Sequence, residues 1–171
     1  VDYDNYFVDT SFGNSYYHRG STPSSVPGVI CVGNISYVYE SGQEPLFNSS
    51  EKGPRVDISA PGGIIPSAAP AGIGPGTPYP LDSNFEIQKQ SGTSMASPQV
   101  AGVVATVLEA RPTYTPEQCL RWLQEVGEED RLYDPTTGTP GTDYSNLRAL
   151  QGAANLYLKT PFRNPNPYSA S

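Results

Sequence analysis

The 171-residue sequence has few of the residues that build metal centres and few basic residues. It contains one histidine and two cysteines, with no close cysteine pair, so a zinc-type site is not expected. No apolar run approaches the roughly 20 residues that span a bilayer. Only 10 Lys and Arg stand against 17 Asp and Glu, which gives a formal net charge of −7. This acidic balance disfavours nucleic acid or an anionic membrane surface as the partner.

The two cysteines, Cys31 and Cys119, leave two interpretations open, a single disulfide or a pair of buried free thiols. Cys31 lies in the apolar run VPGVICVG and Cys119 in a helical pattern, so burial without a bond is favoured. The sequence shows no signal peptide and starts with Val1. We interpret it as a mature or trimmed product, or as a piece of a longer chain.

Strand-like and helical patterns alternate along the chain, which predicts an α/β fold with a mostly parallel sheet. Residues 28–39 begin as a continuous apolar run, typical of a strand buried on both faces, and residues 53–63 contain a second strand. Proline (18) and glycine (17) are abundant, so we expect long irregular connections, in particular over residues 61–84 and 128–142.

Helices are predicted in the second half of the chain. From Val100 onward the apolar residues follow helical spacing, and the lack of a polar face before Glu109 predicts a buried helix. Thr115, Pro116 and Gln118 form a helix start with a cap and a capping-box partner. A final helix is expected over residues 145–158, followed by an irregular tail at 161–171.

The stretch QSGTSMASPQVAG places a glycine and several hydroxyl groups directly before the first of these helices. A serine at a helix N-terminus lies next to N–H groups without intrahelical partners and in the positive potential of the helix dipole. These donors can stabilise an oxyanion, so Ser94 is a candidate nucleophile. The alternative is that Thr93 or Ser94 is a plain N-cap. Pro98 is expected near enough to the helix start for its missing N–H to cost little.

The same stretch resembles the serine motif of the subtilisin-like proteases (subtilases), G-T-S-M-A-[ST]-P-H-V-A-G, from Gly92 to Gly102, with Gln99 in place of His. VPGVICVG, FNSSEKGPRVDISAPGG and YSNLRALQGAA resemble further family segments in the family's order. The resemblance covers roughly residues 20–155. It implies a three-layer subtilisin-like fold of which this chain is the C-terminal portion, with residues 1–160 as part of the catalytic domain.

The resemblance implies acyl transfer through a Ser-His-Asp triad. Ser94 would be the nucleophile, with its own backbone N–H contributing to the oxyanion hole and Thr93 supporting that hole. Gly92 would let the backbone approach the substrate. The departure at Gln99 is expected to face packing and to leave activity intact. No cofactor is required, and structural Ca²⁺ is conceivable but not indicated.

The triad histidine and aspartate have no match in this sequence. The single histidine, His18, stands in YYHRGST, which differs from the family's H-G-T-x-V-A-G helix start, and we assign it a surface or loop role. No aspartate precedes it in a D-[ST]-G context, so the chain alone is expected to be inactive. Asn14 is a candidate for the oxyanion asparagine, although a residue upstream of Val1 is favoured.

Two weaker correspondences concern the substrate pocket and a cation. Pro23 resembles a family proline near the pocket rim, which would place Ser21 and Thr22 close to a substrate side chain. Asp57 matches an aspartate that helps to hold a weak cation in some subtilases. Its usual acidic neighbour is Arg55 here, which argues against that site.

Two hypotheses follow. The first is a serine endopeptidase whose partners are a polypeptide substrate and the N-terminal part of the same catalytic domain, in an extracellular or exported protein. The second is a structural or assembly protein that keeps a subtilase fold and is inactive or only self-processing. Neither involves nucleic acid or a membrane span.

Overall fold

The computed structural model describes residues 6–9, 13–16, 26–37, 44–47, 50, 53, 55–133, 150 and 153–159. The expected tail at 161–171 lies outside these residues. The first elements, β1 (Tyr6–Asp9) and β2 (Gly13–Tyr16), form an antiparallel pair. The remaining elements are β3 (Val32–Ile35), β4 (Glu44–Pro45), β5 (Ile58–Pro61), β6 (Ile65–Pro70), β7 (Thr77–Pro78), β8 (Phe85–Gln90), α1 (Thr93–Ala110), α2 (Pro116–Val126), β9 (Glu128–Glu129), β10 (Leu132–Tyr133) and β11 (Leu156–Tyr157).

The central sheet has the strand order β3-β5-β11-β9. β3 runs parallel to β5, with Val32 opposite Ile58, and β11 is also parallel to β5. Only β9 is antiparallel, against β11. The expected α/β fold with a mostly parallel sheet is therefore confirmed, and both predicted strands, within 28–39 and 53–63, take neighbouring places in it.

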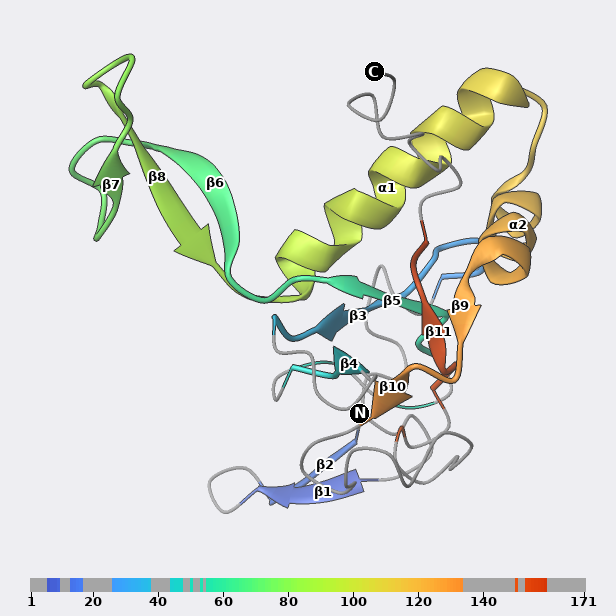
Figure 1. The fold of residues 1–171 in the computed structure, drawn as a ribbon. Coiled ribbons are helices and arrows are strands. Elements are labelled where there is room, and N and C mark those ends of the chain that lie inside the picture. Colours follow the sequence, from blue (N-terminus) through green and yellow to red (C-terminus); the bar gives the residue numbers. More distant parts are fainter. Residues whose placement is uncertain are drawn as a thin grey trace.

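Each face of this sheet is covered (Figure 1). On one face α1 and α2 pack on a core that includes Ile58, Ala60, Val100, Leu123 and Leu156. The other face carries β4 and β10, which pair with each other in parallel, and a second core that includes Ile35, Leu46, Val56, Leu132 and Leu150. The sheet is thus a middle layer, and the start of α1 lies over the ends of β3 and β5.

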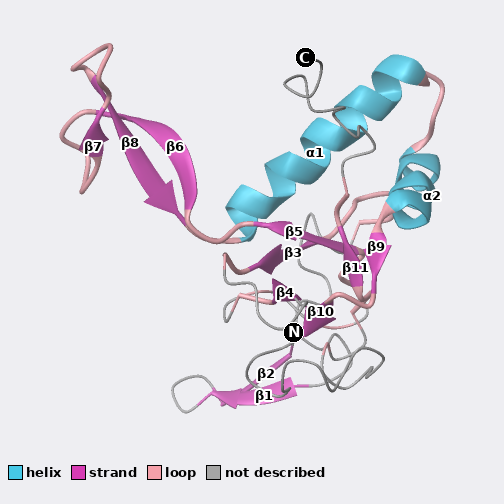
Figure 2. Cartoon of the chain, viewed as in Figure 1, coloured by secondary structure: helices cyan, strands magenta, loops and turns pink. Residues whose placement is uncertain are grey.

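A three-stranded antiparallel arm, with order β6-β8-β7, stands apart from the central sheet (Figure 2). We predicted a loop over residues 61–84, and that prediction is wrong for the strands β6 and β7. Pro66 and Pro70 obscure the strand pattern, but β6 is an edge strand, and an edge needs N–H donors on one side only. The arm closes at a neck, where Gly92 N–H donates to Gly62 O at 2.9 Å and Ile64 N–H to Ser91 Oγ at 2.8 Å.

The second helix is confirmed in detail, whereas the third is not. α2 starts at the capping box of Thr115 and Gln118, in which each residue's backbone N–H donates to the other's side chain, and it ends at Gly127. Within the expected helix over 145–158, Leu156 and Tyr157 form strand β11 instead. Glu128–Glu129 and Leu132–Tyr133 are likewise strands rather than loop. In the part of the chain described, no helix is both long and apolar enough to span a bilayer.

Candidate active site

Helix α1 begins without a side-chain cap. Its N-cap is Gly92, with φ 154° and ψ 169°, a backbone conformation that favours glycine. The N–H groups of Met95 and Ala96 donate to Gly92 O at 3.0 and 3.3 Å. Thr93 and Ser94 are the first two helical residues and do not cap the helix, so the plain N-cap interpretation of either hydroxyl is wrong.

Ser94 is exposed at this helix terminus, whereas the neighbouring hydroxyl of Ser91 is already used in the neck. The backbone N–H of Ser94 belongs to the first turn, where no intrahelical acceptor exists, and the helix dipole adds positive potential there. An accessible hydroxyl beside such donors can attack a carbonyl carbon while the developing oxyanion is stabilised. Thr93, half-buried, lies directly before it in the first turn.

Close backbone contacts fix the position of this terminus. A Cβ built on Gly62 would lie 2.6 Å from Gly92 O and would overlap the side chain of Asn34, so a larger residue at position 62 would push β5 and the helix start apart. Asn34, on β3, is fully buried, and its side-chain oxygen and nitrogen have no hydrogen-bond partner. Three segments distant in sequence therefore meet at the start of α1.

Gln99 makes a polar link that we did not predict. Its Nε2 donates to the carbonyl oxygens of Pro61, at the end of β5, and of Met95, on the preceding helical turn. Gln99 is half-buried, so its side chain packs between these two segments and also bonds to both. Pro98 also differs from expectation. With the helix starting at Thr93, Pro98 is its sixth residue, so its missing N–H removes the helical partner of the Ser94 carbonyl.

The helix is buried on one side only. Ala96, Val100, Val103 and Val107 are buried, whereas Ala101 and Ala105 are exposed, so the expectation of a fully buried helix is wrong for this chain. Beside the exposed side lies an apolar pocket of about 320 Å³ between α1, the segment before β3 and the start of α2. Its lining includes Ile30, Val32, Ser97, Val104, Leu108 and Cys119.

The structure describes some of the other candidate residues and not others. His18, Ser21 and Thr22 lie outside the described residues. Asn14 is in β2, opposite Val8, but nothing is described of its side chain. The two cysteines, half-buried Cys31 and buried Cys119, are not joined in a disulfide, as favoured from the sequence. Among the described residues, no cluster of three or more His, Cys, Asp or Glu side chains is arranged to bind a metal ion.

Another pocket, of about 190 Å³, has a polar lining formed by Glu44, Glu128, Arg131 and Tyr157. Burial raises the pKa of Glu44 above its ordinary value, and nearby Arg131 partly offsets this. Burial, reinforced by the charges of Glu44 and Glu128, also raises the pKa of Tyr157. Arg131 and Lys159 lie 3.2 and 3.6 Å from Glu128 Oε1. The pocket is thus a salt-bridged cluster, and it contains no nucleophile of the Ser94 kind.

The family model of the subtilase family matches residues 5–142. Among curated proteins, the chain is 33% identical over 162 residues to subtilisin-like protease 1 of Arthroderma gypseum, covering 94% of this chain and 29% of that protein. It is 32% identical over 141 residues to a probable subtilase-type serine protease of Deinococcus radiodurans, covering 77% of this chain and 19% of that protein. The chain therefore spans less than a third of the length of these curated relatives.

Solved structures give the same picture. Fervidolysin from Fervidobacterium pennivorans, described as a keratinolytic enzyme related to subtilisin, aligns with a TM-score of 0.61 at 25% identity. The alignment covers 90% of this chain and 20% of that one. A cold-adapted subtilisin-like serine proteinase aligns with a TM-score of 0.54 at 26% identity, over 81% of this chain and 39% of that one. The expected subtilisin-like fold is confirmed by these likenesses.

Proposed function

Because the chain belongs to the subtilase family, we propose that it carries the nucleophile of a serine endopeptidase and that this nucleophile is Ser94. The observation that carries the proposal is the exposed Ser94 in the first turn of α1, a turn that no side chain caps. Capping would be the ordinary reason for a hydroxyl at this place, and here Gly92 is the cap residue.

In the proposed reaction, Ser94 Oγ attacks the scissile carbonyl of a polypeptide and a histidine accepts the hydroxyl proton. The Ser94 N–H stabilises the oxyanion, and Thr93 supports that donor. The histidine returns the proton to the leaving amine, and water then hydrolyses the acyl-enzyme. The histidine and its aspartate partner would come from polypeptide outside these 171 residues, so the chain alone would be inactive, and we place the whole protein outside the cell.

Two features of the described residues support this assignment. The positions of Gly62, Gly92 and Asn34 hold the helix terminus against the ends of β3 and β5, which gives the rigid support that a nucleophile needs. The apolar pocket and the exposed small residues on the same helix offer a surface on which further polypeptide of the catalytic domain would pack.

A serine-directed fluorophosphonate probe tests the proposal on the full-length protein. We expect labelling to be lost in Ser94→Ala and retained in Ser97→Ala, a matched control that removes an exposed hydroxyl one turn along the same helix. Casein hydrolysis should fall by roughly 10⁶-fold in Ser94→Ala. If the folded full-length protein is not labelled at all, the proposal is wrong and the structural or assembly role is favoured.

A further inference from the structure

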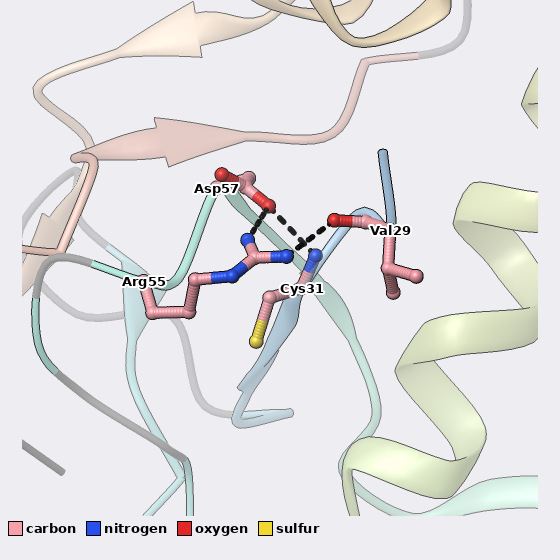
Figure 3. Close-up of polar contacts among 4 residues, drawn as sticks. All are labelled: Val29, Cys31, Arg55 and Asp57. Atoms are coloured by element: carbon pink, nitrogen blue, oxygen red, sulfur yellow. Dashed lines mark hydrogen bonds and ion pairs between the residues drawn. The ribbon is translucent and has the colours of Figure 1, made fainter. Parts of the chain in front are cut away.

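Two oxygens, Asp57 Oδ2 and Val29 O, converge on the Arg55 side chain beside the segments that lead into β3 and β5 (Figure 3). Arg55 Nη1 lies 2.5 Å from Asp57 Oδ2, and Arg55 Nη2 donates to the carbonyl oxygen of Val29 at 2.5 Å. The backbone N–H of Cys31 donates to the same Asp57 oxygen at 2.8 Å. The guanidinium therefore joins the segment before β3 to the segment before β5.

This arrangement does not fit the cation that the family resemblance suggested near Asp57. Hard cations such as Ca²⁺ bind several carboxylate and carbonyl oxygens at once. Here the carboxylate oxygen of Asp57 and the carbonyl oxygen of Val29 are already bonded to a permanently charged group. The side chains of Arg55 and Asp57 are only 23% and 18% exposed, so solvent screens their charges weakly.

We infer that the Arg55 guanidinium is a built-in replacement for a bound cation at this site. It supplies the positive charge beside Asp57 and the link to Val29 O that an ion would otherwise supply. Stability at this corner of the domain is then independent of metal, and the inference does not depend on the protease proposal.

The surroundings also predict what happens when the guanidinium is removed. A pocket of about 210 Å³ adjoins the pair and is lined by Val29, Arg55, Asp57 and Glu117, among others. With a carboxylate in place of Arg55, the site would contain two side-chain carboxylates and a backbone carbonyl, which is the oxygen set that Ca²⁺ prefers. Arg55→Glu should therefore turn the ion pair into a cation site.

The experiment compares wild type, Arg55→Glu and the double variant Arg55→Glu/Asp57→Asn in the full-length protein. Tm is measured in EDTA and in Ca²⁺, and the number of bound Ca²⁺ ions is measured by calorimetry. We expect Arg55→Glu to melt several degrees below wild type in EDTA, to regain much of that loss in Ca²⁺, and to bind one more Ca²⁺ per chain than wild type. The double variant should bind no additional ion and should show no such recovery.

Each variant's Tm and number of bound Ca²⁺ ions are compared with those of wild type, so the contribution of any calcium site elsewhere in the protein cancels. The inference is overturned if Arg55→Glu gains no calcium dependence. It is also overturned if Asp57→Asn in the wild-type background lowers the number of Ca²⁺ ions bound, because wild type would then hold a metal beside the arginine. If Arg55→Glu does not fold in either buffer, Arg55→Gln decides. Its Tm must fall in EDTA and rise in Ca²⁺ by more than that of wild type, and the absence of that rise overturns the inference.

Discussion

Replacing Gln99 tests how strongly the start of α1 depends on its link to β5. The Gln99 amide donates to Pro61 O and Met95 O. Met95 O keeps its helical partner, the backbone N–H of residue 99, whatever the side chain, so the bond to Pro61 determines the effect. A net hydrogen bond contributes about 0.5–1.5 kcal/mol, and a buried acceptor left without a donor costs about 1–3 kcal/mol. Because Gln99 is half-buried, we expect Gln99→Leu to lower the free energy of unfolding by about 1–2 kcal/mol.

The order of a small variant series follows from the same geometry. Gln99→Glu keeps the size of the side chain but places a carboxylate against two carbonyl oxygens, so it should cost more than Gln99→Leu at neutral pH. Acidification should narrow that gap, because a protonated carboxyl group can donate a hydrogen bond. Gln99→His introduces the residue of the family motif and keeps an N–H donor, so it should cost less than Gln99→Leu.

Urea unfolding of the full-length protein measures these differences, and fluorophosphonate labelling of Ser94 reports the position of the helix start. We expect the free energy of unfolding and the extent of Ser94 labelling both to decrease from Gln99→His to Gln99→Leu and again to Gln99→Glu. A Gln99→Glu variant as stable as wild type at neutral pH would refute the reasoning, because the side chain could not then be bonded to Pro61.

The capping box and the polar pocket give two further predictions for the full-length protein. Thr115→Ala removes the acceptor for the Gln118 N–H and should lower the free energy of unfolding by about 1 kcal/mol in urea, whereas Thr115→Ser should be nearly neutral; equal losses in both would contradict the capping role. Burial raises the pKa of Glu44 above its ordinary value of 4.5, so the folded state binds this proton more tightly than the unfolded state. Stability from this group is then greatest below about pH 4.5 and falls as the pH rises through the window up to the raised pKa. Glu44→Gln should remove that fall, so the Tm of the variant relative to that of wild type should rise as the pH increases above about 4.5; a Tm difference that does not change with pH would contradict the raised pKa.

Features set by nearby residues could be predicted from the sequence, and features set by distant partners could not. The start of α2 depends on Thr115 and Gln118, three residues apart, and the structure confirms it. Leu156 and Tyr157 have a helical sequence pattern, but Tyr157 pairs with Ser59, nearly a hundred residues away in sequence, and the strand is preferred. The arm was missed for the same reason, because its strands depend on cross-strand pairing rather than on local propensity.

In the candidate site, too, the sequence predicted what nearby residues determine and missed what distant partners determine. The motif around Ser94 indicated which hydroxyl lies at the helix start, and the structure adds that Gly92 is the cap residue. The bond from Gln99 to Pro61 spans 38 positions and gives no local signal. Arg55 was recognised only as a departure from a pattern, and its bond to the carbonyl of Val29 required the folded chain.

Because hydrogen bonds close the neck of the arm, the position of Ser94 does not depend on how long the arm is. Gly92 N–H to Gly62 O and Ile64 N–H to Ser91 Oγ close the chain before the helix begins, so residues 65–90 form an exchangeable module attached at one point. Doubling the length of a flexible loop costs only about 0.6 kcal/mol in closure entropy. Descendants or engineered forms of this protein can therefore lengthen, shorten or replace the arm beside the site while the helix start keeps its place.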